Sequence, residues 1–131
     1  NYQLSIVNYQ LKEMALSEEL PIYKTSIDLL EQLTDLQKGM ARFYRYTLGA
    51  RMTDECLDML GLIYRANMVR EERERTLVEL IVHYRRLQML LRVLYRKKGV
   101  SSGRYAVLVQ MLDSIGRQST AWLASCHKQQ G

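Results

Sequence analysis

Three arginines on one predicted helix have the spacing needed to bind a polyanion. With about 100° between successive residues, Arg92 and Arg96 lie within about 20° of Arg85 around the helix axis. Four leucines between positions 87 and 94 fall on the opposite side, which predicts that the arginines face outward. No acidic residue occurs between positions 83 and 104. The residues predicted to contact phosphates are Arg85, Arg86, Arg92, Arg96, Lys97, Lys98 and Arg104.

A purely solvated helix face is the alternative explanation for these arginines. Solvated faces usually mix both signs of charge, because like charges one turn apart repel by about 0.2–0.5 kcal/mol. Arg92 and Arg96 are such a like-charge pair, and no acid near them in the sequence relieves the repulsion. Nucleic-acid or other polyanion binding is therefore favoured over a solvated surface, and both remain open.

Apolar side chains are predicted beside the arginines on the same outward edge. They fall between about 20° and 80° from Arg85 around the helix. A surface that carries both apolar groups and arginines is typical of protein–protein interfaces, so we expect an oligomer contact here. A closed ring would also bring several copies of the arginines together and strengthen their field. The predicted interface residues are Val78, Val82, Met89 and Val93.

The distribution of charge along the chain also indicates a polyanionic partner. The whole sequence has 19 Lys and Arg against 14 Asp and Glu, a net charge of +5. Residues 1–80 hold 10 basic and 13 acidic side chains, which gives −3. Residues 81–131 hold 9 basic side chains and 1 acidic side chain, Asp113, which gives +8. An excess that is confined to one part of the chain favours a polyanion such as nucleic acid as the partner.

Catalytic and metal-binding patterns are absent from the sequence. A di-iron helical bundle needs Glu-x-x-His pairs, and neither His83 nor His127 has a Glu three residues before it. Glu79 lies four residues before His83, a spacing more typical of a surface ion pair. The sequence also lacks zinc-site spacing, a phosphate loop, a nucleophile elbow and a dinucleotide fingerprint. We therefore expect no enzyme activity, no metal and no cofactor.

Two classes of helical enzyme are disfavoured by the positions of the basic residues. Helical ribonucleases place an Arg shortly before a His on one helix, whereas Arg75 and His83 are separated by seven residues. A chorismate-mutase-like site needs inward-facing Arg, Lys and Glu, whereas the basic residues here are predicted to face outward.

Aromatic residues offer a second potential contact with nucleic acid. Tyr44 and Tyr46 lie beside Arg42 and Arg45, and such interleaving can bind bases. The alternative, which we favour, is an amphipathic loop that packs on the rest of the fold. Trp122 has the spacing of a core residue and is expected to pack rather than to stack on a base.

Length and composition bound the class of protein that carries these residues. A chain of 131 residues with an apolar fraction of 47% suits one globular domain. No run of about 18 uncharged apolar residues exists, so no membrane-spanning helix is expected, and no secretory signal is visible. Cys56 and Cys126 are too few for a disulfide framework and fit reduced thiols in a cytoplasmic protein.

Apolar residues recur at three- and four-residue steps, which predicts helices throughout the first half of the chain. The segment from residue 1 to about 16 is expected to be helical. Ser17 is then expected to cap a second helix, which carries Pro21 in its first turn. This helix should end near Lys38, with Gly39 as the stop.

The second half of the chain shows the same helical periodicity. A helix is predicted to start near residues 45–47 and to break between residues 67 and 72. The helix that carries the arginines should run from about residue 72 to 98, with Gly99 as its C-cap. The last helix should be capped by Ser101 or Ser102 and end near residue 125.

Long helices joined by short connections predict an all-α fold, an antiparallel up-down-up-down four-helix bundle. The expected organisation is a helical N-terminal leader over residues 1–19, the bundle over residues 20–126 and a polar tail over residues 127–131.

Four short stretches of the chain resemble the Avd-like four-helix-bundle family. This family comprises the accessory variability determinants of diversity-generating retroelements. Its superfamily includes proteins encoded in intervening sequences of bacterial large-subunit ribosomal RNA genes. The resemblance covers about residues 20–125, departs at Ala121, where the family commonly has Gly before its Trp, and leaves residues 1–19 unassigned. The stretches are LPIYKT (20–25), YRYTLG (44–49), LIYRAN (62–67) and LDSIGR (112–117), the last followed by Trp122 and Leu123.

The resemblance implies a barrel-like homo-oligomer, a homopentamer, with a basic surface. It also implies a reverse transcriptase as partner and binding of template RNA or cDNA during mutagenic retrotransposition, with no catalytic centre in the accessory protein itself. The family does not identify individual base-contacting residues, so the basic residues named above rest on helix geometry alone. Two alternatives stay open. One is a ribosomal-RNA intervening-sequence protein without a reverse transcriptase partner, and the other is a purely structural helical oligomer.

Overall fold

The computed structural model describes residues 2–130, and it describes their side chains except at positions 9–16, 129 and 130. All of the regular secondary structure in this range is helical, which confirms the all-α prediction. A π-helical turn, η1 (Arg45–Gly49), joins α3 to α4, and a 3-10 turn, η2 (Arg70–Glu72), precedes α5. The helices are α1 (Tyr2–Glu18), α2 (Pro21–Gly39), α3 (Arg42–Tyr44), α4 (Ala50–Met68), α5 (Arg73–Arg96) and α6 (Ser102–Gln130).

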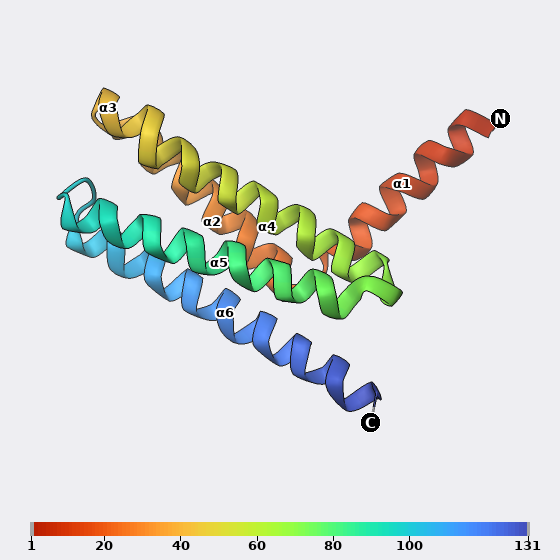
Figure 1. The fold of residues 1–131 in the computed structure, drawn as a ribbon. Helices are drawn as coiled ribbons and strands as arrows, with labels where there is room; N and C mark the ends of the chain where they lie inside the picture. Colours follow the sequence, from red (N-terminus) through yellow and green to blue (C-terminus); the bar gives the residue numbers. More distant parts are fainter. Residues whose placement is uncertain (1, 131) are drawn as a thin grey trace.

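The helices α2, α4, α5 and α6 pack side by side, and consecutive members of this set run in opposite directions (Figure 1). Each has two neighbours, because α4 contacts α2 and α5, and α6 contacts α5 and α2. Helix α1 contacts α2 and α4 near the turn that leads into α2, and the rest of α1 projects away from the other helices (Figure 1). The α2–α3 turn and the α5–α6 turn lie at the same end of the molecule, on the left of Figure 1.

The core between these helices is built from the apolar stripes that the sequence periodicity predicts. Each large side chain buried there contributes about 1.5–3 kcal/mol to folding. The five buried leucines on α5 fix its rotation, so the opposite edge of that helix faces solvent. The largest fully buried side chains are Leu29, Leu33, Met52, Met59, Ile63, Leu77, Leu80, Leu87, Leu91, Leu94, Leu108 and Leu112.

The prediction that Ser17 caps the second helix is wrong. Ser17 lies in the last turn of α1, is buried, and its Oγ accepts a hydrogen bond from Asn67 Nδ2 at 3.2 Å. Helix α2 begins instead at Pro21, with Leu20 in the N-cap position. Proline suits the first helical position because its missing N–H would have had no partner there. The end of α2 at Gly39 agrees with the sequence.

The second long helical segment begins earlier than predicted. It starts at Arg42 rather than near residues 45–47, and the π turn η1 carries it into α4 without a break. Side chains hold this corner, because Gln37 Nε2 donates to the Arg45 carbonyl at 3.0 Å and Thr53 Oγ1 donates to Gln37 Oε1 at 2.8 Å. The predicted break near residue 69 is confirmed, since α4 ends at Met68 and η2 follows.

Helix α6 extends further than predicted. Ser101 caps it, since its Oγ accepts the Arg104 N–H at 3.2 Å, as one of the two alternatives expected. The helix then continues to Gln130, beyond the predicted end near residue 125, so the segment predicted as a polar tail is helical up to residue 130, and residue 131 lies outside the described residues. None of the described helices, including this long one, is apolar enough to cross a lipid bilayer.

Lys98, and not Gly99, adopts the left-handed conformation that ends α5. Its φ is 62°, and the hydrogen bonds from Lys98 N–H to Tyr95 O and from Gly99 N–H to Leu94 O form a Schellman motif. Gly99 has a negative φ. Glycine is favoured at this position for a different reason, because an added Cβ would collide with the Leu94 side chain.

Replacing Lys98 with glycine is expected to stabilise the protein by about 0.5–1 kcal/mol, because a positive φ is strained for a residue with a Cβ. Urea unfolding measures the change. Lys97→Gly is the matched control, since it removes the same charge at a residue with φ −82° and should not stabilise. Equal effects of both substitutions would contradict the assignment of strain to Lys98.

Candidate nucleic-acid interface

The arginines predicted to face outward on α5 do so. Arg85, Arg92 and Arg96 are all exposed. Arg85 Nη1 donates to Gln88 Oε1 at 3.1 Å, and its guanidinium lies 5.4 Å from the centre of the Tyr84 ring. Among the residues that the structure describes, no carboxylate lies within 4.0 Å of the guanidinium of Arg92 or Arg96. Their charges are therefore unneutralised at the surface.

The turn after α5 adds exposed cations to the same region, and the α2–α3 turn adds more from a distant part of the sequence. Lys97, Lys98 and Arg104 are exposed, as predicted, and Lys38 and Arg42 are exposed at the same end of the molecule (Figure 1). No acidic residue occurs in segments 36–53 and 84–112, which build this end. We call these five residues the basic end. The sequence did not reveal that Lys38 and Arg42 lie beside the turn after α5, because only folding brings the two turns together.

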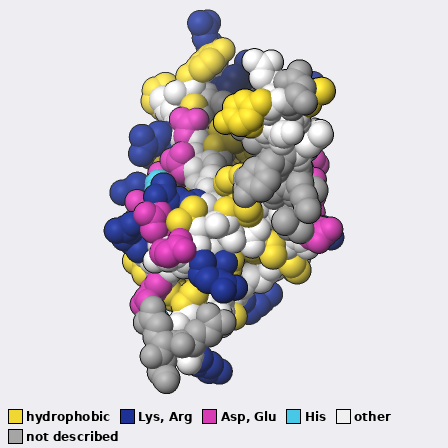
Figure 2. Space-filling model, turned by 90° about the vertical axis from the view of Figure 1, so that its right-hand side faces the viewer, with side chains coloured by type: hydrophobic (Ala, Val, Ile, Leu, Met, Phe, Trp, Pro, Cys, Tyr) yellow, Lys and Arg dark blue, Asp and Glu magenta, His cyan; other side chains and the backbone are white. Residues whose placement is uncertain are grey.

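The opposite end of the molecule carries charges of both signs. Figure 2 shows that side, where Asp and Glu lie among Lys and Arg. Glu72 pairs with Arg65 and with Arg75, the latter at 3.0 Å, and the hydrogen bond from Arg65 is the main cause that lowers the pKa of Glu72. His127 Nε2 lies 2.7 Å from Glu74 Oε1. Because these charges compensate one another, the positive excess of the chain is concentrated at the basic end and on α5.

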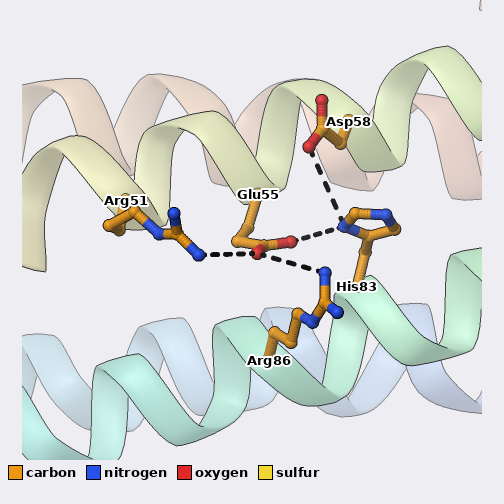
Figure 3. Close-up of polar contacts among 5 residues, drawn as sticks. All are labelled: Arg51, Glu55, Asp58, His83 and Arg86. Carbon is orange, nitrogen blue, oxygen red and sulfur yellow. Dashed lines mark hydrogen bonds and ion pairs between the residues drawn. The ribbon is translucent and has the colours of Figure 1, made fainter.

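Arg86 differs in its surroundings from the other residues predicted to contact phosphates, and its role in binding stays a prediction. It follows Arg85 by one residue and is therefore turned by about 100°, toward α4. Its Nη1 lies 4.0 Å from Glu55 Oε1, and Arg51 Nη2 approaches the same oxygen at 4.0 Å (Figure 3). Arg86 therefore belongs to an ion-pair network between α4 and α5, and not to the row formed by Arg85, Arg92 and Arg96.

His83 lies at the centre of the same network. Its Nδ1 is 2.5 Å from Glu55 Oε2 and 3.8 Å from Asp58 Oδ2 (Figure 3). The Glu55 side chain is only 5% exposed, and the His83 side chain is 19% exposed. The predicted pairing of His83 with Glu79 is therefore replaced by pairing across the helix interface. A buried carboxylate needs such partners, since an unpaired buried charge is strongly destabilising.

The three side chains Glu55, Asp58 and His83 also offer ligand atoms within 4.8 Å of one another, a set that a divalent cation can use. Arg51 and Arg86 oppose this use, because their guanidinium groups already lie 4.0 Å from the Glu55 carboxylate. Two positive charges in contact with the only buried ligand repel a cation and replace it as the counter-charge. We therefore interpret the cluster as an ion-pair network.

The aromatic–basic segment at 42–46 is helical, and its residues differ in their surroundings. Arg45 Nη2 donates to the carbonyls of Lys38 and Met40, both at 3.2 Å, so this guanidinium holds the α2–α3 turn. Tyr44 packs against the core, whereas Tyr46 is 68% exposed. The prediction that this segment is a loop is therefore wrong, because its residues lie in α3 and η1. The expected packing on the rest of the fold holds for Tyr44 and Arg45.

A stacked tyrosine pair, which sequence reasoning missed, lies where α5 meets α6. The rings of Tyr95 and Tyr105 are 4.1 Å apart, with 7° between their planes. Tyr105 also lines a groove of about 480 Å³ between the two helices, together with Arg85 and Arg92. The only signal in the sequence was the excess of tyrosine, nine against one phenylalanine.

The predicted oligomer-interface residues form an exposed apolar strip beside the arginines. Val78 is 50% exposed, Val82 45%, Met89 60% and Val93 42%. Such exposure is high for large apolar side chains on one helix, and it is compatible with burial against another protein surface.

The remaining candidates for chemistry are buried packing residues. Burial raises the pKa of the Cys56 thiol to about 12, so it is protonated and unreactive at neutral pH, and it faces the Ser26 carbonyl at 3.6 Å. Cys126 is also free and buried. Trp122 packs against the core as predicted, with the Arg73 guanidinium 5.8 Å from its ring.

Comparison with known proteins identifies the family of this chain. No curated protein matches the sequence. A family profile described as bAvd-like matches residues 21–126, from the first residue of α2 to near the end of α6. These bounds agree with the resemblance over about residues 20–125, and they leave α1 outside the match. Because the match covers most of the chain, this protein belongs to the bAvd-like family.

Proposed function

We propose that this protein is a non-catalytic, cytoplasmic accessory protein of a diversity-generating retroelement. It binds template RNA or cDNA and associates with the reverse transcriptase during mutagenic retrotransposition. The observation that supports binding most directly is the row of exposed Arg85, Arg92 and Arg96, which have no carboxylate within 4.0 Å in the described part of a chain of the bAvd-like family. Phosphates neutralise such a row, and the release of their counterions supplies the binding free energy.

Binding of this kind depends little on base sequence. The arginines and the five residues of the basic end are exposed and extend over two turns and one helix edge, an arrangement suited to a phosphate backbone. Arg86 is exposed as well, and its guanidinium lies 4.0 Å from the Glu55 carboxylate, which offsets part of its charge.

The proposed unit of assembly is an antiparallel up-down-up-down four-helix bundle, and five copies form a barrel-like ring. The exposed strip of Val78, Val82, Met89 and Val93 is the proposed contact. A ring repeats the arginine row around the assembly and raises its local potential. Sedimentation of the purified chain tests this, and a monomer at micromolar concentration would contradict it.

A filter-binding titration of a labelled RNA against salt concentration tests the nucleic-acid part of the proposal. The logarithm of the binding constant is expected to fall linearly with the logarithm of salt concentration. A single strand that contacts Arg85, Arg92 and Arg96 alone gives a slope of about −2, and contacts to the basic end make it steeper. Binding that is absent, or that does not change with salt, would contradict the proposal.

Co-purification with a reverse transcriptase encoded beside the gene tests the partner. If the gene has no such neighbour and lies within a ribosomal RNA gene, the chain is instead a ribosomal-RNA intervening-sequence protein. The RNA titration does not separate these two proteins, because both have the same fold, but it separates them from a purely structural oligomer.

A further inference from the structure

The groove between α5 and α6 has the size of a site for a small ligand. Its volume, about 480 Å³, falls within the range of about 300–1,000 Å³ that is usual for small-molecule pockets. Such a space admits a nucleobase and its sugar, but not a double helix, whose major groove alone is about 12 Å wide. The residues that line it include Arg85, Gln88 and Arg92 on α5 and Tyr105, Val109 and Leu112 on α6.

The groove also offers the three kinds of group that bind an unpaired base. Val109 and Leu112 are apolar, and Leu112 is only 2% exposed, so they provide an apolar wall backed by the core. Tyr105 faces the groove and is backed by the Tyr95 ring at 4.1 Å, which holds its plane. Arg85 and Arg92 stand at the rim, seven residues or about 10 Å apart along the helix axis, which leaves room for a nucleotide.

We propose that this groove binds one base of a single-stranded nucleic acid, stacked on Tyr105, while Arg85 and Arg92 bind the flanking phosphates. The inference rests on the proposed function and adds that the α5–α6 site prefers single strands to duplexes. Bases are free to stack on protein rings only where they are unpaired, whereas phosphates are available in both forms. The tyrosines therefore contribute to single-strand binding alone, and the arginines contribute to the binding of both.

Fluorescence anisotropy with the full chain separates the two contributions. The probes are a labelled single-stranded RNA of about 20 nucleotides and its duplex with a complementary strand. The parent is expected to bind the single strand more tightly. Tyr105→Leu and Tyr95→Leu keep an apolar side chain and are each expected to weaken single-strand binding about tenfold, with duplex binding unchanged.

Two further sets of variants control for folding. Tyr95→Phe and Tyr105→Phe keep the rings and should retain single-strand binding. Tyr23→Leu replaces another half-buried tyrosine that packs against the core, on α2 and outside the groove, and should bind both probes as the parent does.

A single strand that carries 2-aminopurine tests the stacking directly. Its fluorescence should fall on binding the parent, because stacking quenches this base, and should be retained on binding Tyr105→Leu.

Each outcome supports or overturns the inference. Equal losses for both probes in the leucine variants would show that the tyrosines act only through the fold. If the leucine variants bind the single strand as the parent does, the base binds outside the groove. If they bind as the parent does but sediment differently, the groove is an interface between copies of the chain. In all three cases the parent still binds RNA, so the proposed function stands. Failure of the parent to bind either probe would overturn the proposed function and the inference together.

Discussion

Replacing Arg85, Arg92 and Arg96 together with glutamate is expected to weaken RNA binding by about a hundredfold or more at about 0.15 M salt. The three side chains are exposed, so the substitutions should leave the helix content and the unfolding midpoint nearly unchanged. The loss arises because three phosphate contacts become three repulsions. Filter binding measures the affinity, and circular dichroism confirms the fold.

A matched control separates local charge from net charge. The substitutions lower the net charge from +5 by six units, to −1. Lys24→Glu, Arg70→Glu and Lys128→Glu together change the net charge by the same amount at three exposed positions near the end of the molecule away from the basic end. This control should lose far less affinity. Equal losses in the two variants would mean that net charge, and not the arginine row, determines binding.

The arginine row could be predicted because it depends on helical periodicity alone. Leucines at three- and four-residue spacing determine which edge of α5 is buried, and positions 85, 92 and 96 then lie on the other edge. The same reasoning did not reveal the neighbour of Arg86, because Glu55 lies 31 residues earlier on α4. The basic end was only partly predicted for the same reason, since Lys38 and Arg42 join it through the fold.

Helix ends followed the sequence where one local preference dominated, and departed from it where tertiary contacts competed. Gly39 ends α2 and Ser101 caps α6, as local preference predicts. Ser17 is also a good cap, yet it continues α1 because its hydroxyl is used by Asn67 on a neighbouring helix. Likewise, no pattern in the sequence predicts the stacking of Tyr95 on Tyr105, because this contact forms only when α5 and α6 pack together.

The ion-pair network between α4 and α5 has the largest expected effect on stability. Replacing His83 with alanine is expected to destabilise the protein by about 2–4 kcal/mol, because it removes the closest partner of the buried Glu55 carboxylate. Arg51 and Arg86 at 4.0 Å keep the loss below that of an unpaired buried charge. Urea unfolding followed at 222 nm measures the change in the free energy of unfolding.

Two comparisons distinguish this network from a simple packing defect and from a metal site. Replacing Glu55 and His83 together with leucine removes the charge that needs compensation, and should cost less than His83→Ala alone. Asp58→Asn should cost less than about 1 kcal/mol, because Asp58 is 60% exposed. Since the guanidinium groups of two arginines, and not a metal ion, neutralise Glu55, addition of a chelator should leave the unfolding midpoint of the parent unchanged. A midpoint that falls with the chelator would instead assign Glu55, Asp58 and His83 to a bound metal ion, because a ligand that binds only the native state raises the free energy of unfolding, and its removal lowers it.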